Sequence, residues 1–187
     1  MVSAAREVLL DSASRLFYDH GITATGVDAV VRAAGVTKPT LYAHFGAKSD
    51  LVAAVLQRRF EARRNELGAW LEPVPVAGHP LAVLDWLQHF YVDRGDRGCG
   101  FLNAAAELGA RDPAARAVVE AEKTWLLDVL VRGCAAYGSR TPEVVGSQLL
   151  LLVDGVAGRA VVGGRAAAHD AAVEARQAGD VLLAASR

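Results

Sequence analysis

Hydrophobic residues recur at helical spacing along most of this chain, and no segment shows the sustained two-residue alternation of a β-strand. Near the start, Val8, Ala13 and Phe17 fall on one face of a helix that Gly21 ends. Gly and Pro residues separate the periodic segments. The sequence therefore predicts an all-α fold of about nine helices, near Val8–His20, Val27–Ala34, Thr37–Gly46, Lys48–Leu71, Leu81–Asp93, Phe101–Leu108, Ala114–Tyr137, Pro142–Val162 and Ala167–Ser186.

The second and third predicted helices are short, and a turn that contains Gly35 joins them. Leu41 and Phe45 lie on the apolar face of the third helix, and Thr37 can cap its start. Its opposite face is polar, with Lys38, Thr40, Tyr42 and His44. Such a pair is typical of a helix-turn-helix, whose second helix enters the major groove of DNA. A plain structural hairpin of two helices has the same pattern.

Composition limits the other interpretations. The chain has 187 residues, is 52% hydrophobic and carries a formal net charge of -1, so its total charge does not indicate a nucleic-acid partner. The one basic cluster, Arg58, Arg59, Arg63 and Arg64, is interpreted as a solvated helix face.

Neither a leader nor a membrane span is predicted. Charged residues interrupt the N-terminal segment, so we expect a cytoplasmic protein with no membrane partner. The most apolar segment, Val144–Val153, stops at Asp154, well short of the roughly 20 residues that a transmembrane helix needs. Cys99 and Cys134 lack metal-ligand spacing and are expected to be small buried hydrophobes, so we predict neither a metal site nor a cofactor.

From Ala5 to about Val55 the chain resembles the TetR family of transcriptional regulators, through LFYDHGITATGVDAVVRAAGVTKPTLYAHFGAKSDLVAAVL. The LFYDHG segment, the AGV turn, the TLYAHF helix and the KSDL start of the fourth helix occur in register. The resemblance implies a homodimer with an N-terminal helix-turn-helix domain, residues 1–47, and a C-terminal ligand-binding and dimerisation domain, residues 48–187. It implies three partners: a double-stranded DNA operator, a second copy of the chain and a small apolar or amphipathic effector. The function it implies is a repressor that the effector releases from a palindromic operator, although the sequence does not encode the sign of regulation.

Carried over residue by residue, the family's DNA contacts fall on Thr25, Thr37, Lys38, Pro39, Thr40, Tyr42, His44 and Lys48. The chain departs from the family at Gly26 and Ala47, where a capping Ser or Thr is common. The resulting free amides at the start of the fourth helix can bind either a DNA phosphate or water.

The C-terminal part gives weaker signals. We expect a cavity among its helices that is lined by aromatic side chains and a few polar groups. The candidate lining residues are Trp86, Phe90, Phe101, Asn103, Glu107, Trp125 and Asp154. Each of these residues alone also fits a core or surface role. The penultimate helix is apolar nearly all round, and a second subunit could cover its outer side. The expected dimer interface is Leu149, Leu152, Gly155, Val156, Gly158, Ala171, Ala175, Ala178 and Leu182.

Two other classes of protein remain possible on the sequence. In an enzyme, His89 or His169 could act as a base and Cys99 as a nucleophile, but no acid, base and nucleophile occur at a spacing that defines a site. GVAGRAVVGG lacks the preceding strand of a phosphate-binding loop. A helical interaction module without DNA would explain the apolar last helices but would leave the polar face of the third helix without a purpose. We therefore predict that the protein is not an enzyme.

Overall fold

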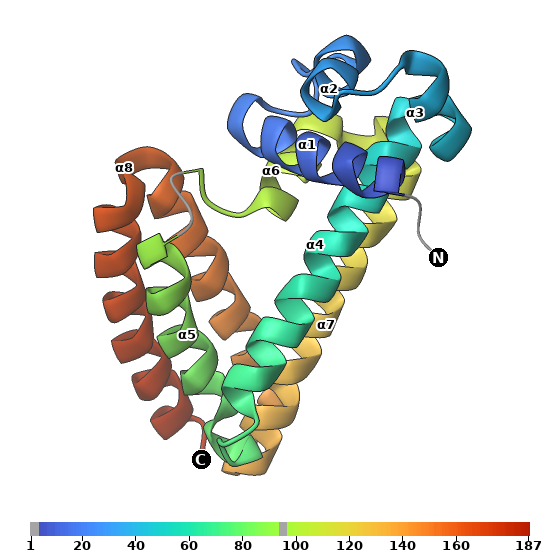
Figure 1. Ribbon diagram of the computed structural model, residues 1–187. Helices are drawn as coiled ribbons and strands as arrows, with labels where there is room; N and C mark the ends of the chain where they lie inside the picture. The colour runs from blue at the N-terminus through green and yellow to red at the C-terminus, as the bar shows by residue number, and fades with distance from the viewer. Residues whose placement is uncertain (1–3, 94–96) are drawn as a thin grey trace. The chain divides into compact units, whose positions relative to one another are not determined.

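The computed structural model describes residues 4–93 and 97–187, and every regular element within these ranges is helical (Figure 1). The all-α prediction is confirmed. The elements are α1 Ala4–His20, α2 Val27–Ala34, α3 Lys38–His44, α4 Lys48–Leu71, a 3-10 turn at Val76–Gly78, α5 His79–Asp93, α6 Gly100–Leu108, a second 3-10 turn at Gly109–Arg111, α7 Pro113–Tyr137 and α8 Pro142–Ala185.

The chain divides into two compact units. Unit 1 comprises the described residues up to Ala62 together with Gly100–Ala121, and unit 2 comprises Arg63–Cys99 and Glu122–Arg187. The predicted division after residue 47 therefore falls inside unit 1, because the first half of α4 packs with α1. Arg58 of α4 pairs there with Asp11 of α1 at 2.8 Å.

In unit 1, α1, α2 and α3 pack on one another. Val30 and Val31 of α2 and Leu41 of α3 are buried, as the spacing of the apolar residues predicts. The turn between the two helices depends on Gly35, which has a φ of 66° in the left-handed region that favours glycine. Its N–H bonds to the Arg32 carbonyl oxygen at 3.3 Å and closes the end of α2.

In unit 2, α8 is two helical arms that meet at Gly164, where φ is 69° and ψ is -161°. Figure 1 shows the two arms running in opposite directions beside α5. The break lies in the predicted gap between the last two helices, so these two predicted helices are the arms of α8. Gly179 lets the second arm approach α5, since a Cβ there would lie 2.6 Å from a methyl carbon of Leu84.

By length and composition α8 could cross a membrane, in contrast to the sequence prediction. A helix that is buried in the core of a protein can have the same length and apolar composition. Leu149, Val153, Val156 and Ala160 of the first arm are buried within the protein. Asp154 in the same arm is ion-paired with Lys123 of α7. Burial in unit 2 therefore accounts for part of the hydrophobicity of α8, while Leu151 and Val162 remain exposed.

Candidate nucleic-acid interface

The two faces of α3 have opposite environments. Leu41 is 0% exposed and Phe45, just after the helix, is 4% exposed, whereas Tyr42 is 48% exposed. Thr37 caps the helix, because its hydroxyl oxygen accepts a hydrogen bond from the Thr40 N–H at 3.3 Å. The hydroxyls of Thr37 and Thr40 also lie 2.9 Å apart and bond to each other. The helix thus presents hydroxyl groups at its first turn and a phenol at its middle.

Lys38 lies in the exposed first turn of α3. Its ammonium nitrogen lies 2.7 Å from Asp28 Oδ1 of α2, and both side chains are more than half exposed. The hydrogen bond with Asp28 and its negative charge raise the pKa of Lys38. Because this pair is open to solvent, a DNA phosphate or base edge can compete with Asp28 for the lysine.

Of the predicted DNA contacts, Pro39 is exposed in the first turn of α3 and His44 is half-buried near its end.

Two other predicted DNA contacts, Thr25 and Lys48, form hydrogen bonds within unit 1. The Thr25 side chain is buried, and its hydroxyl donates to the Gly21 carbonyl oxygen at 2.7 Å. Lys48 donates from Nζ to the Ile22 carbonyl oxygen at 2.6 Å. Burial lowers the pKa of Lys48, and the nearby Glu107 carboxylate opposes this shift. Both side chains therefore hold the turn before α2, and their contacts with DNA stay predictions.

The two helix starts that lack a capping side chain differ. Gly26 precedes α2 without any side-chain hydrogen bond, as the sequence predicts. At α4, the Ala47 N–H instead donates to Asp50 Oδ2 at 3.0 Å. This acceptor is the returning half of a capping box, and it could have been found from the Asp three residues after Ala47. The carboxylate thus takes one of the amides for which the sequence left a DNA phosphate and water as alternatives.

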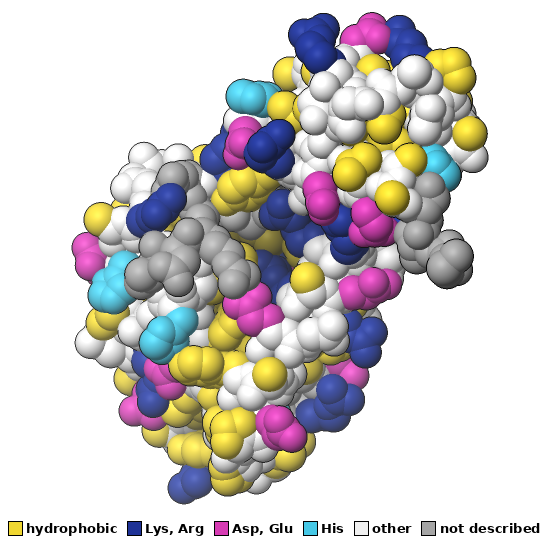
Figure 2. All heavy atoms as spheres, in the orientation of Figure 1, with side chains coloured by type: hydrophobic (Ala, Val, Ile, Leu, Met, Phe, Trp, Pro, Cys, Tyr) yellow, Lys and Arg dark blue, Asp and Glu magenta, His cyan; other side chains and the backbone are white. Residues whose placement is uncertain are grey.

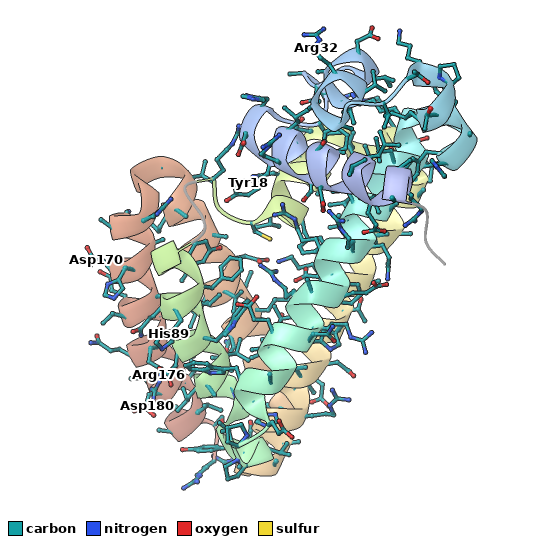
Figure 3. The ribbon with its side chains drawn as sticks, in the orientation of Figure 1. Tyr18, Arg32, His89, Asp170, Arg176 and Asp180 are labelled. Carbon is teal, nitrogen blue, oxygen red and sulfur yellow. The ribbon has the colours of Figure 1, made fainter. Side chains whose placement is uncertain are left out.

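The basic cluster on α4 is not a single solvated face. Arg58 is ion-paired with Asp11, and Arg59 lies 4.9 Å above the ring of Tyr18. Arg63 turns inward, with a side chain that is only 10% exposed. Arg32 at the end of α2 is exposed and points outward in Figure 3, although the sequence analysis did not select it. Acidic and basic side chains are interspersed on the face shown in Figure 2, in agreement with the near-zero net charge.

The predicted effector residues fall in separate places. Asn103 and Glu107 line a pocket of unit 1 between α1, α4 and α6, and its volume of about 20 Å³ holds one water. Phe101 is fully buried in the same unit. In unit 2, Trp125 lines a wider groove of about 530 Å³ with apolar side chains and Arg64, Glu72, His79 and Arg132 at its edge.

The other predicted effector residues surround a buried ion pair in unit 2. Arg63 Nη1 donates to Glu122 Oε1 at 2.6 Å, and Glu122 is 0% exposed. The guanidinium lies 5.7 Å from the ring centre of Trp86 and 5.4 Å from that of Phe90. Among the described residues, none forms a hydrogen bond with the buried Glu122 Oε2, and Lys123 Nζ lies 3.9 Å from it. Sequence reasoning missed this pair because Arg63 and Glu122 are 59 residues apart and each fits a solvated helix face.

The predicted dimer residues differ in their exposure to solvent. Leu149, Val156, Ala171 and Ala175 are buried within the protein itself, where α5 packs against α8. Gly155 and Gly158 are exposed, and Leu152, Ala178 and Leu182 are half-buried. Val144, Leu151 and Val162 continue the glycine line on the outer face of the first arm, with exposed fractions of 55%, 69% and 87%.

Comparisons with known proteins agree with this architecture. Residues 9–55 match the family model for bacterial regulatory proteins of the tetR family. The transcriptional activator FasR of Mycolicibacterium smegmatis is 48% identical over 56 residues, which are 30% of this chain and 26% of FasR. The repressor ComR of Escherichia coli is 46% identical over 63 residues, which are 32% of this chain and 30% of ComR. The match therefore spans less than a third of either curated relative.

The likeness to solved structures extends much further. A TetR-family transcriptional regulator from Streptomyces coelicolor is 30% identical with a TM-score of 0.88, and the match covers 97% of this chain and 95% of that one. A putative regulator of the same type from Streptomyces avermitilis is 25% identical with a TM-score of 0.78, over 98% of both chains. Together with the helix-turn-helix of unit 1, this likeness along the whole chain shows that the protein belongs to the TetR family of transcriptional regulators.

Proposed function

We propose that the protein is a dimeric, cytoplasmic repressor that binds a palindromic DNA operator through α3 and leaves it when a small effector binds. The exposed polar face of α3 carries this proposal. Its apolar side is anchored by Leu41 and Phe45, and its outer side presents Tyr42 and the ion-paired Lys38. In this scheme residues 1–47 recognise DNA, and residues 48–187 bind the effector and form the dimer. No catalytic step is part of the proposal.

The dimer is proposed to form through the outer face of α8. Val144, Leu151 and Val162 are exposed there. Gly155 and Gly158 lie between Leu151 and Val162, at spacings of four, three and four residues, and Val144 lies seven residues before Leu151. This spacing makes one apolar stripe along a helix, and glycines let a facing helix approach closely. A homodimer about a two-fold axis pairs the same stripe from both copies. It would place two copies of α3 on related half-sites.

The effector is proposed to bind in unit 2, beside the Arg63–Glu122 pair. Within the described part of the chain, the nearest cation to Glu122 Oε2 in an ion pair, Lys123 Nζ, lies 3.9 Å away, beyond hydrogen-bond distance, and a ligand N–H or O–H group would satisfy this oxygen. Trp86 and Phe90, whose ring centres are 4.9 Å apart, supply the aromatic surface beside it. Release from DNA requires that the effector bind one arrangement of the two DNA-reading heads better than the other.

Two of the residues that an enzyme could use, His89 and Cys99, contact neighbouring side chains of unit 2. His89 lies with its ring centre 4.7 Å from that of Trp70, and Cys99 is buried near Arg63. Burial raises the pKa of Cys134 to about 11, which disfavours its reactive thiolate. These observations favour binding over catalysis.

Selection of sites from a random DNA pool tests DNA recognition directly. The wild-type protein should recover a near-palindromic motif. Lys38→Ala should relax the preference at one position of each half-site, at a cost of roughly 1–3 kcal/mol if the lysine makes a bidentate base contact. Tyr42→Phe should weaken binding to all sequences alike, because a phosphate contact carries no sequence information.

Arg116→Ala is the control for these variants, since it also removes a positive charge but from an exposed ion pair on α7. It should leave both motif and affinity unchanged. Failure of the wild-type protein to recover any palindrome would contradict the proposed function. An unchanged motif from Lys38→Ala would contradict the role of Lys38 alone. A reporter gene behind the recovered site then distinguishes repression from activation.

Asp28 gives a second test of the same face. Asp28→Asn removes the partner that holds Lys38 and an exposed negative charge beside the proposed DNA-reading helix. Operator affinity at low salt should therefore rise, and the gain should shrink as salt screens the charges. Fluorescence anisotropy with labelled operator across a salt series measures both effects. Weaker binding of Asp28→Asn at every salt concentration would show that the ion pair itself positions Lys38 for recognition.

A further inference from the structure

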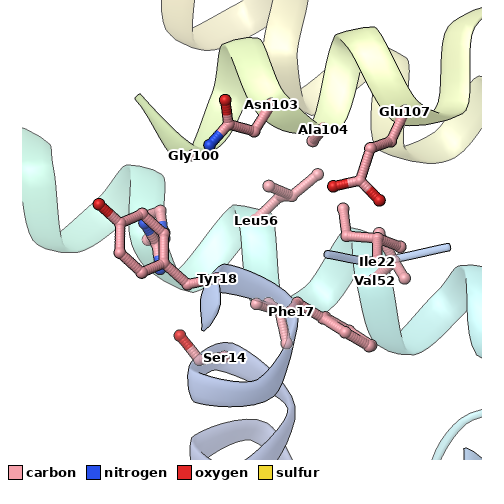
Figure 4. Close-up of a pocket in the computed structure, with 12 residues that line it drawn as sticks. Ser14, Phe17, Tyr18, Ile22, Val52, Leu56, Gly100, Asn103, Ala104 and Glu107 are labelled. Atoms are coloured by element: carbon pink, nitrogen blue, oxygen red, sulfur yellow. The ribbon is translucent and has the colours of Figure 1, made fainter. Parts of the chain in front are cut away.

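The turn between α1 and α2 rests on a side chain from a distant part of the chain. The Thr23 N–H donates to Glu107 Oε2 of α6 at 2.8 Å, across 84 residues of sequence. Gly21 has a φ of 91°, and a Cβ at this position would lie 3.0 Å from the same oxygen. Figure 4 shows the Glu107 side chain extending from α6 toward the segment that carries Ile22. The missing side chain of Gly21 therefore leaves room for the carboxylate.

Two further hydrogen bonds hold the same turn. Lys48 at the start of α4 donates to the Ile22 carbonyl oxygen at 2.6 Å. Thr25 donates to the Gly21 carbonyl oxygen at 2.7 Å and closes the turn just before α2. The backbone of residues 21–23 is thus fixed by groups from α4 and α6 as well as from its own segment. Since α2 follows this turn directly, its conformation sets how the helix-turn-helix leaves α1.

We infer that Glu107 is a positioning residue for DNA recognition, which acts through the Gly21–Thr23 turn and touches no DNA itself. Glu107 lies outside residues 9–55, the segment that matches the family model. The inference rests on the proposed function, because it assigns to α6 a part in the orientation of α3. A carboxylate that accepts a backbone N–H makes a charge-assisted bond, stronger than a neutral one. Any movement of α6 that withdraws the carboxylate would release the turn and lower operator affinity.

The test compares Glu107→Ala with the conservative Glu107→Gln in the full chain. Glu107→Ala should bind the selected operator about tenfold more weakly, the equivalent of one charge-assisted hydrogen bond. Its affinity for unrelated DNA should not change. Glu107→Gln keeps an acceptor oxygen for the Thr23 N–H and should restore most of the affinity. Hydrogen exchange at the Thr23 amide should be fast in the alanine variant and slow in the glutamine variant.

Glu120→Ala on α7 is the matched control, because it removes an exposed carboxylate from unit 1 and should change neither affinity nor exchange. Operator affinity of Glu107→Ala equal to that of the wild type would overturn the inference. So would an equal loss on operator and unrelated DNA. The absence of any operator for the wild type would instead overturn the proposed function.

A double-mutant cycle between Gly21 and Glu107 provides a second measurement that does not depend on one variant alone. Gly21→Ala strains the backbone in either background, but only in the wild type does the new methyl group also displace the Glu107 carboxylate. Its effect on operator affinity should therefore be several-fold smaller when Glu107 is already Ala. Equal effects in both backgrounds would show that the turn and Glu107 act independently, and would overturn the inference.

Discussion

Glu122→Ala should lower the free energy of unfolding by about 3–5 kcal/mol, the usual cost when one partner of a buried ion pair is lost. Glu122 is 0% exposed, and the Arg63 side chain that it holds at 2.6 Å is 10% exposed. Without the carboxylate, the guanidinium stays buried beside Trp86 and Phe90 and loses the oxygen that accepts its Nη1–H. Lys123, 3.9 Å from Glu122 Oε2, also loses a neighbouring anion but keeps its ion pair with Asp154.

The joint variant Arg63→Met with Glu122→Leu should recover most of this loss, because well-packed apolar residues can replace a buried pair without desolvating charges. Urea unfolding of the two single variants and the double variant measures the coupling between the residues. Glu120→Ala, in an exposed pair with Arg116, should leave the urea midpoint nearly unchanged. Single variants as stable as the wild type would show that the pair contributes nothing to the fold.

The double variant also tests the effector proposal. It lacks the Glu122 oxygen that would accept a ligand hydrogen bond. It should bind the operator like the wild type but respond less to an effector that carries an N–H or O–H donor. An unchanged response would place the effector elsewhere in unit 2, for example in the groove beside Trp125.

Gly158→Arg should convert the proposed dimer to a monomer and weaken operator binding at least a hundredfold. Gly158 is exposed in the stripe between Leu151 and Val162, and no other described atom lies within 4 Å of its Cβ position. The arginine can therefore fit the isolated protomer but would block close approach of a second α8. Loss of the second DNA-reading head removes the effective concentration that linked binding provides. Analytical ultracentrifugation and an operator titration measure the two effects.

Leu149 provides the contrast, because it lies on the same arm but is 0% exposed. Leu149→Ala should lower the free energy of unfolding by about 2–5 kcal/mol and leave the folded protein dimeric. Glu120→Arg, which places an exposed arginine on α7, should leave the protein dimeric. A wild-type monomer at micromolar concentration, or a dimeric Gly158→Arg, would contradict the proposed interface.

Local sequence determined the helices and the helix-turn-helix of this protein. The spacing of Val30, Val31 and Leu41 predicts the buried faces of α2 and α3, and Gly35 predicts the turn between them. The Thr37 cap and the break between the arms of α8 could also be predicted. These features depend on interactions within a few residues, where helical periodicity, capping and glycine conformation act directly.

Tertiary structure decided which side of each helix meets which neighbour. The apolar residues of α8 did not reveal that Leu149 and Val156 pack inside the protomer whereas Leu151 and Gly158 face outward. For the same reason the charged run around Arg63 predicts a surface position for this residue. The sequence does not indicate its partner Glu122, which is 59 residues away. Lys48 and Glu107 likewise have roles that follow from their hydrogen bonds to the turn between α1 and α2, which is distant from both in sequence. Helical periodicity defines faces but not their partners, because contacts between segments distant in sequence form only when the whole chain packs.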